Sequence, residues 1–227
     1  MTGIGGSAFS GCSSLTAITI PEGMTSIEFA AFASCSSLSN ITIPVNVNTI
    51  GRSTFRNCTS LTSINIPKSV TRIQCWAFCN CSSLTTINIP ESVTTIEGFA
   101  FDKCSGLTSI NIPQGVTSIG WGAFRDCSSL NAILIPKSVT EIGKQALMNT
   151  GITYLTILGK PTIDEGAFDE CKNLTEIYCY SEEVPPAENA FDELDLSPIT
   201  LHVPESAMEQ YKNTEPWSRF GTIVAIK

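Results

Sequence analysis

The feature that most constrains the fold is an internal repeat of 23 residues, which occupies most of the chain. Four residue types recur at this step, and each forms a column. The columns are Pro21, Pro44, Pro67, Pro90, Pro113 and Pro136; Phe9, Phe32, Phe55, Phe78, Phe101 and Phe124; Cys12, Cys35, Cys58, Cys81, Cys104 and Cys127; and Leu15, Leu38, Leu61, Leu84, Leu107 and Leu130. Self-similarity at a fixed period predicts a solenoid, in which each unit buries its apolar face against the next one.

The unit at residues 61–84 shows how each repeat must fold. Ile64 and Ile66 are two positions apart, so both point to the same face of a strand. Pro67 ends that strand because proline has no N–H group to donate to the ladder. The repeat therefore predicts six strands, near residues 15–20, 38–43, 61–66, 84–89, 107–112 and 130–135.

The second half of each unit predicts two further segments. Val70 and Ile73 form a second, shorter extended segment. Ala77 and Phe78, followed by Cys81, indicate a helical turn, because positions i and i+3 share one face of a helix. The chain then returns to the strand position one layer further along the stack.

The spacing of these residues resembles the repeat of a known family. The pattern L-x-x-I-x-I-P-x-x-V-T-x-I-x-x-x-A-F-x-x-C resembles the BspA-like, Treponema-type leucine-rich repeats of bacterial surface proteins, over roughly residues 4–180. The resemblance implies a β-rich α/β solenoid, a right-handed superhelix of about eight to nine coils with short helical turns. It also implies a secreted or surface-displayed adhesin or interaction protein. It supplies neither a ligand nor a catalytic residue.

Two units are expected, a solenoid over residues 1–180 and an irregular last coil with a C-terminal cap over residues 181–227. Ile4 takes the column of Ile27 without a preceding strand, so we expect a fragment that lacks the N-terminal end of its solenoid and an export signal. One unit near residue 150 is two residues short, which predicts a local bend. Residues 205–211 predict a short helix, and Trp217 is expected to plug the open end of the core.

The charge distribution excludes a nucleic-acid-binding protein. Residues 1–140 carry seven Lys/Arg and six Asp/Glu, a net +1, whereas residues 141–227 carry six against fifteen, a net −9. A nucleic-acid binder is expected to show a basic stripe, and this C-terminal third repels phosphate. The acidic end is interpreted as a solvated cap, since no loop has the spacing of an EF-hand calcium site.

The candidates for metal or catalytic chemistry are few. Stacked cysteine side chains point the same way, so the cysteine column favours buried free thiols over disulfides. Cys75, Cys79 and Cys81 lack the second ligand pair of a zinc site. His202 is the single histidine, and nothing upstream suggests a nucleophile for it. A glycosidase carboxylate pair is not ruled out by spacing alone. We expect no enzyme activity, no cofactor, no metal and no catalytic residue.

Large side chains just before each Ala-Phe pair are the candidate binding residues. They stand where the repeat accepts small residues, and cations are interleaved with them. The set is Phe29, Arg52, Arg56, Trp76, Phe99, Lys103, Trp121 and Arg125. Aromatic and arginine side chains are typical interface anchors. Two alternatives stay open: the rings could instead cover the ends of the Ala-Phe turns, and the Thr/Asn columns of the strand face could be either a binding carpet or ordinary exposed strand residues.

The prediction for function is a non-enzymatic, extracellular or cell-surface interaction protein. It is expected to bind a host or bacterial surface or matrix protein, or a glycan, as a monomer without a membrane-spanning segment. The alternative is a structural spacer of a larger surface protein, without a ligand of its own.

Overall fold

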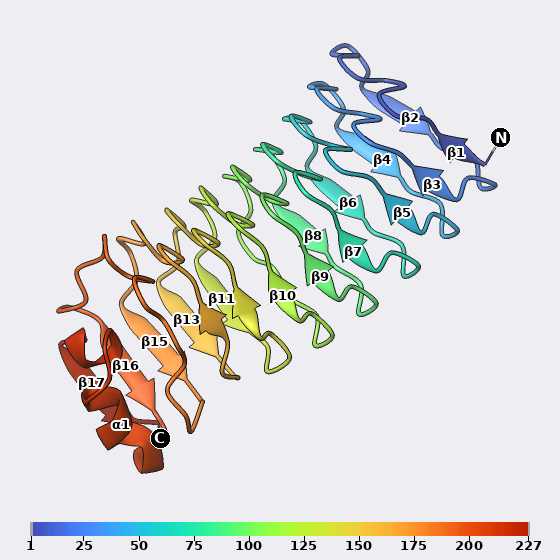
Figure 1. Cartoon of the computed structure of the whole chain (residues 1–227). Coiled ribbons are helices and arrows are strands. Elements are labelled where there is room, and N and C mark those ends of the chain that lie inside the picture. Colours follow the sequence, from blue (N-terminus) through green and yellow to red (C-terminus); the bar gives the residue numbers. More distant parts are fainter. Residues whose placement is uncertain (1, 227) are drawn as a thin grey trace.

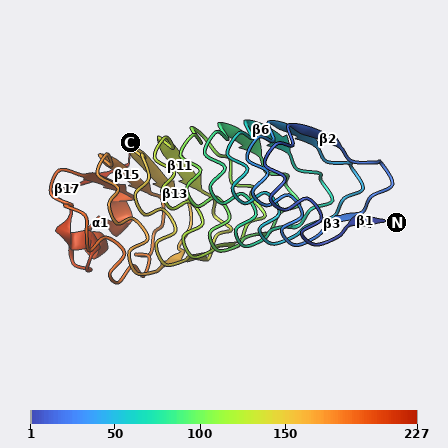
Figure 2. The ribbon, with the colours of Figure 1, turned by 90° about the horizontal axis from the view of Figure 1, so that it is seen from above.

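The chain forms an elongated stack of about ten coils, with its two ends at opposite ends of the stack (Figure 1). The structure is a computed structural model that describes residues 2–226, so Met1, the first residue of the expected solenoid, lies outside the described residues. Seen from above, successive coils lie side by side along one axis (Figure 2). The predicted β-rich solenoid is confirmed, and its right-handed sense stays a prediction.

One column of strands comes from the Leu-x-x-Ile-x-Ile half of each unit. Its strands are β2 (Ala17–Thr19), β4 (Asn40–Thr42), β6 (Ser63–Asn65), β8 (Thr86–Asn88), β11 (Ala132–Ile135), β13 (Tyr154–Ile157), β15 (Glu176–Cys179), β16 (Thr200–Val203) and β17 (Thr222–Ala225). They pair in parallel, as β2–β4, β6–β8 and β11–β13–β15–β16–β17. The strand predicted at residues 107–112 is wrong: only Thr108 donates a ladder hydrogen bond to the coil before it, at 3.2 Å to Thr85 O, so consecutive ladder bonds are missing there.

The second extended segment of each unit forms a second column. Its strands are β1 (Gly3–Ile4), β3 (Ser26–Ile27), β5 (Thr49–Ile50), β7 (Arg72–Ile73), β9 (Thr95–Ile96), β10 (Ser118–Ile119), β12 (Glu141–Ile142) and β14 (Thr162–Ile163). They pair as β1–β3–β5 and β7–β9–β10–β12–β14. Ile4 pairs with Ile27, which confirms the column expected for it.

The segment that contains Ala-Phe is a tandem turn, and the predicted helical turn is wrong. In the third unit, Ala77 N–H donates to Gln74 O at 3.1 Å, and Cys81 N–H donates to Phe78 O at 3.1 Å. The third residue of each turn, Trp76 and then Asn80, has a positive φ of 55° and 58°. A right-handed helix cannot contain such residues, whereas a type II turn requires one at this position.

The core consists of ladders that run along the axis of the stack. Phe78 is fully buried and stacks on Phe55 at 5.6 Å and on Phe101 at 5.4 Å between ring centroids. Cys81 Sγ donates to the carbonyl of Phe55 at 3.1 Å, and the other buried thiols of the column bond in the same way to the preceding coil. The buried thiol column is therefore confirmed, except that Cys12 in the first coil is exposed.

The short unit keeps the ladder register. β11 pairs with β13 at a step of 22 residues, and β12 pairs with β14 at a step of 21. In this shorter unit, two glycines allow the backbone to approach that of the preceding coil. A Cβ on Gly151 would lie 2.1 Å from Ser128 O, and one on Gly159 would lie 2.8 Å from Lys137 O. The bend expected at this unit stays a prediction.

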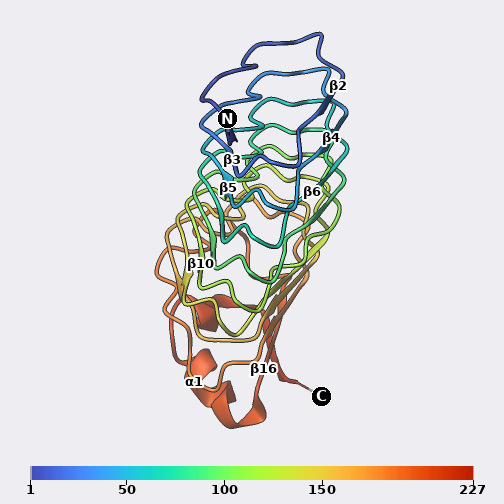
Figure 3. The same cartoon turned by 90° about the vertical axis from the view of Figure 1, so that its right-hand side faces the viewer.

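The C-terminal end is closed by short helices, η1 (Glu205–Ala207), α1 (Met208–Lys212) and η2 (Trp217–Arg219), which pack under the last coils (Figure 3). The short helix and the plug are confirmed, since Trp217 is fully buried and its Nε1–H donates to Pro185 O at 2.8 Å. The domain boundary at residue 180 stays a prediction. No helix within residues 2–226 has the length and apolar character needed to span a membrane.

Candidate binding surface

The eight predicted binding residues lie along one edge of the solenoid, which the tandem turns form. Backbone hydrogen bonds join these turns from coil to coil: Trp76 N–H donates to Gly98 O at 3.1 Å, and Phe99 N–H donates to Trp121 O at 2.7 Å. The turns therefore carry side chains at fixed positions, one set per coil. We call this edge the ridge, defined by Phe29, Arg52, Arg56, Trp76, Phe99, Lys103, Trp121 and Arg125.

Three aromatic rings form the centre of the ridge. Trp76 and Phe99 stack with centroids 5.6 Å apart and planes 3° apart. Phe99 meets Trp121 at 5.1 Å, with planes 52° apart. Trp76 and Phe99 are half-buried by these contacts, while Trp121 keeps 52% of its surface exposed. The rings thus cover one another in part, and an aromatic surface remains open to solvent.

The backbone beneath the rings is in an unusual conformation. Trp76 and Phe99 have φ values of 55° and 57°, and the same position in other coils holds small residues such as Ala30 and Ser53. The left-handed region costs an L-residue about 1–2 kcal/mol. Bulky residues in this region are outliers that motivate a functional hypothesis.

Gly122 lies beside the ridge and was not predicted to contribute to it. It follows Trp121 and has a φ of 58°, and a Cβ placed on it would lie 2.6 Å from Cε1 of Phe99. The ring of Phe99 therefore lies over the bare backbone of the next coil, and only glycine leaves room for it. The signal in the sequence was a glycine directly after Trp121.

Two guanidinium groups flank the aromatic rings. Cζ of Arg52 lies 4.1 Å from the centroid of Trp76, and Cζ of Arg125 lies 5.1 Å from that of Phe99. A cation over an aromatic face contributes about 0.5–1 kcal/mol at an exposed site. Arg125 is fixed further by the buried Asp102, whose Oδ1 lies 2.8 Å from Nε.

The other predicted residues are placed less tightly. Arg56 and Lys103 are exposed and form no salt bridge within the described part of the chain. Phe29 is 54% exposed and has no aromatic neighbour among residues 2–226. The structure thus brings together Arg52, the three central rings and Arg125, and leaves the remaining three side chains as separate points on the same edge.

The two thiols near the ridge donate hydrogen bonds to carboxylates. Cys79 Sγ donates to Asp102 Oδ2 at 3.6 Å, and burial raises the pKa of Cys79 to about 11. Cys75 Sγ donates to Glu97 Oε2 at 3.4 Å, and burial also raises its pKa. A thiol with a raised pKa carries less thiolate at neutral pH, and the thiolate is the reactive form. Within residues 2–226, no three His, Cys, Asp or Glu side chains are grouped to hold a metal ion.

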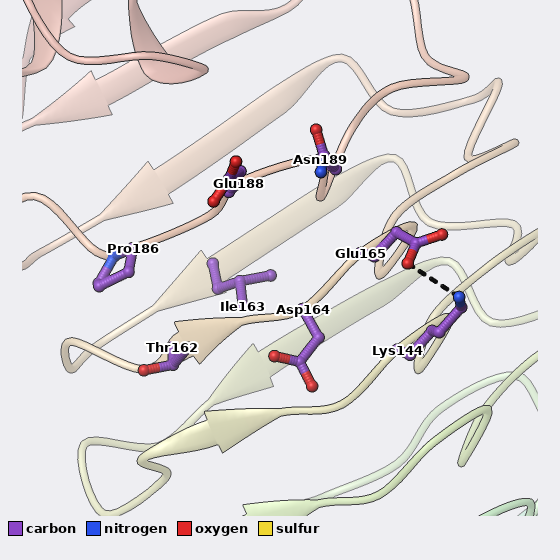
Figure 4. Close-up of a pocket in the computed structure, with 8 residues that line it drawn as sticks. All are labelled: Lys144, Thr162, Ile163, Asp164, Glu165, Pro186, Glu188 and Asn189. Atoms are coloured by element: carbon purple, nitrogen blue, oxygen red, sulfur yellow. Dashed lines mark hydrogen bonds and ion pairs between the residues drawn. The ribbon is translucent and has the colours of Figure 1, made fainter.

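Beyond Trp121 the same edge becomes acidic and leads to a hollow of about 430 Å³ (Figure 4). Lys144 Nζ pairs with Glu165 Oε2 at 2.8 Å at its side, and Asp164 and Glu188 line it. The hollow opens where the second strand column ends, at β14. Beyond β14 the next coil has no strand in this column within the described chain, and Ile163 N–H donates to Pro186 O of that coil at 2.8 Å. The ridge, which carries arginine and lysine side chains, is therefore bounded at this end by negatively charged carboxylates.

Comparison with known proteins identifies the family of this solenoid. The family model described as "BspA type Leucine rich repeat region" matches residues 2–120 and 94–213, with six copies. No curated protein sequence matches the chain.

Among solved structures, a leucine-rich repeat protein from Bacteroides ovatus is similar, with 27% identity and a TM-score of 0.66 over 99% of this chain and 64% of that protein. The leucine-rich repeat protein of T. pallidum has 27% identity and a TM-score of 0.53 over 71% of this chain and 68% of that one. A leucine-rich cell surface protein from Faecalibacterium prausnitzii shares the fold, with 24% identity, a TM-score of 0.50 and coverage of 100% and 83%. Its repeat, its fold and the family match together show that the chain belongs to the BspA-type leucine-rich-repeat family.

Proposed function

We propose that this chain is a non-enzymatic interaction protein that binds a protein partner through the ridge. The observation that carries the proposal is the stack of Trp76 and Phe99 on strained backbone, with the guanidinium of Arg52 over the ring of Trp76. Seven other units of the solenoid achieve the same turn with small or flexible residues, so the fold does not require these rings. Side chains that the core does not need are free to serve binding.

The make-up of the ridge favours a protein partner. Tryptophan and arginine are the residues most enriched at the energetic centres of protein interfaces, where they pack into desolvated pockets. Trp121 and Phe29 supply exposed apolar surface, and Arg52, Arg56 and Lys103 supply positive charge around it. We infer a partner surface that offers an apolar pocket with carboxylates at its rim, because opposite potentials steer such an encounter.

The proposed location is the bacterial cell surface or the extracellular space. The F. prausnitzii protein of the same fold is described as a cell surface protein, and this description supports the location. The chain spans 64% of the length of the B. ovatus protein, and the activity and partners of the whole protein are part of the proposal. We further propose that the chain acts as a monomer and has no enzymatic activity.

The test is binding of the purified chain to an array of extracellular-matrix and bacterial surface proteins. The Trp76→Ala/Trp121→Ala variant is run beside it, because Ala30 shows that alanine is compatible with the left-handed turn position. We expect a partner whose affinity falls at least about thirtyfold in the variant, as for two interface anchors. The matched control is Tyr154→Ala, which removes an equally exposed ring from the strand face and should leave this affinity unchanged.

Two outcomes contradict the proposal. A partner that binds the double variant as tightly as the wild-type chain would show that the ridge is not the binding surface. The absence of any partner would favour the alternative function, a spacer that holds another domain away from the cell. Circular dichroism of each variant shows whether its fold is retained.

A further inference from the structure

The strand face carries a groove lined by exposed amide groups, on a surface separate from the ridge. Asn65, Asn88 and Asn111 occupy one position in three successive coils, next to Pro67 and Pro90. The groove that they line has a volume of about 660 Å³, compared with about 430 Å³ for the acidic hollow beyond Trp121. Most lining residues of the groove lie on β6 and β8 or follow these strands in the chain, and β6 and β8 lie in neighbouring coils of the stack (Figure 1).

The amides of this groove differ from other asparagines in the chain. At the turn edge, Asn80 Nδ2–H donates to Asn57 Oδ1 at 3.1 Å, and Asn57 Nδ2–H donates to Ser34 Oγ at 3.4 Å. The side-chain amides of Asn65, Asn88 and Asn111 have no hydrogen-bond partner among residues 2–226, and all three residues are exposed. Stacked amides can bond to one another, as they do at the turn edge. The three amides of the groove do not, so their donors and acceptors are free for solvent or for a ligand.

The same strand face becomes aromatic toward the C-terminal end. Tyr154 is 52% exposed on β13. Tyr178 on β15 stacks on His202 of β16, with ring centroids 4.2 Å apart and planes 6° apart. His202 Nε2 lies 2.5 Å from Glu176 Oε2, so the imidazole and the carboxylate hold each other in place. Leu134, which follows Asn111 in its column, is 43% exposed and links the two regions.

We propose that this face binds a neutral, linear oligosaccharide along the axis of the solenoid. Hydroxyl groups donate and accept hydrogen bonds, and so does each free amide of the groove. Lys68 and Glu91 place one charge of each sign at the groove, so it offers no net charge to an ionic ligand. The exposed face of an aromatic ring can pack against the C–H face of a sugar ring, which gives Tyr154 a role.

The geometry favours a saccharide over a polypeptide. β6 and β8 pair with each other, and the coils on either side cover the two outer edges of this pair: β4 packs against β6, and Thr108 N–H donates to Thr85 O at 3.2 Å beside β8. A peptide therefore has no open strand edge to join on this face. The groove also presents the same side chain at every coil, about 4.8 Å apart. A repeating surface of this kind matches a polymer that repeats one chemical unit, and it does not match a polypeptide of varied side chains.

Affinity electrophoresis of the purified chain tests this proposal. Native gels contain hydroxyethyl cellulose, galactomannan, laminarin or dextran as neutral polysaccharides, and alginate as a charged one. We expect retardation in at least one neutral gel. The Asn65→Ala/Asn88→Ala/Asn111→Ala variant should bind the same polysaccharide about tenfold more weakly or worse, because three hydrogen-bonding groups are lost at an exposed site that tolerates alanine. Tyr154→Ala should weaken binding as well.

The control separates this proposal from the proposed function. The Trp76→Ala/Trp121→Ala variant changes the ridge alone and should be retarded as strongly as the wild-type chain. No retardation in any neutral gel, or equal retardation of the asparagine variant, would overturn the saccharide proposal and leave the protein-binding ridge untouched. Retardation in alginate alone would also overturn it, because the ligand would then be ionic.

Discussion

Substitution of Gly122 by alanine tests the packing of the ridge. Gly122 has a φ of 58°, which costs alanine about 1–2 kcal/mol. The added Cβ would also lie 2.6 Å from Cε1 of Phe99, which forces the ring to move. Overpacking of this kind costs about 1–3 kcal/mol. The expected loss in the free energy of unfolding is therefore about 2–5 kcal/mol.

A double-mutant cycle separates the two contributions. In a Phe99→Ala background the ring is gone, so Gly122→Ala should cost only the backbone part, about 1–2 kcal/mol. Gly11→Ala is the matched control, because Gly11 has a φ of 76° and nothing within 4 Å of the added Cβ. Urea unfolding followed by far-UV circular dichroism measures each loss from the midpoint and the slope. Equal costs of Gly122→Ala in both backgrounds would refute the account of the ring lying over the glycine.

Four further predictions follow from which side chains are buried and which are exposed. Acrylamide should quench a Trp76→Phe/Trp121→Phe variant far less than the wild-type chain, because Trp217 is fully buried; equal quenching would show that the cap is open. Ellman's reagent should react first with the exposed Cys12. Burial raises the pKa of Cys58 to about 12, from an ordinary value of 9.0, so the unfolded chain loses this proton first and the free energy of unfolding should fall as pH rises from about 9 to 12; urea midpoints under reducing conditions at about pH 8 and pH 10 check the sign. Phe78→Ala should lower the free energy of unfolding by about 3–5 kcal/mol, and a loss below about 1 kcal/mol would contradict a continuous ring ladder.

The fold was predictable because one period governs every buried column. The apolar pair of each strand, its proline and the Phe and Cys ladders need no contact outside the neighbouring unit, so local spacing describes the whole architecture. The helical turn was the main error. Its i, i+3 spacing is shared by tandem turns, and the useful signal was Asn57 and Asn80 with Gly11 in one column, because asparagine and glycine tolerate a positive φ.

The candidate surfaces were predictable only in part. Trp76, Phe99 and Trp121 stood out because they interrupt columns of small residues. Their contacts depend on rotamers, and the column position of Arg52 does not reveal that its guanidinium reaches the ring of the next coil. The asparagine groove was predicted only as part of the Thr/Asn columns of the strand face, for a similar reason: which amides bond to each other is a property of side-chain geometry, and asparagine is common on exposed strands.

The most direct test of the central claim, that a partner contacts the ridge, is hydroxyl-radical footprinting with and without the partner identified on the protein array. Oxidation of Trp121 and Phe29 is measured, with Tyr154 as an equally exposed reference on the strand face and Trp217 as a buried one. The account predicts that the partner protects Trp121 and Phe29 and leaves Tyr154 unchanged. Protection of Tyr154 with unchanged oxidation of Trp121 would contradict it.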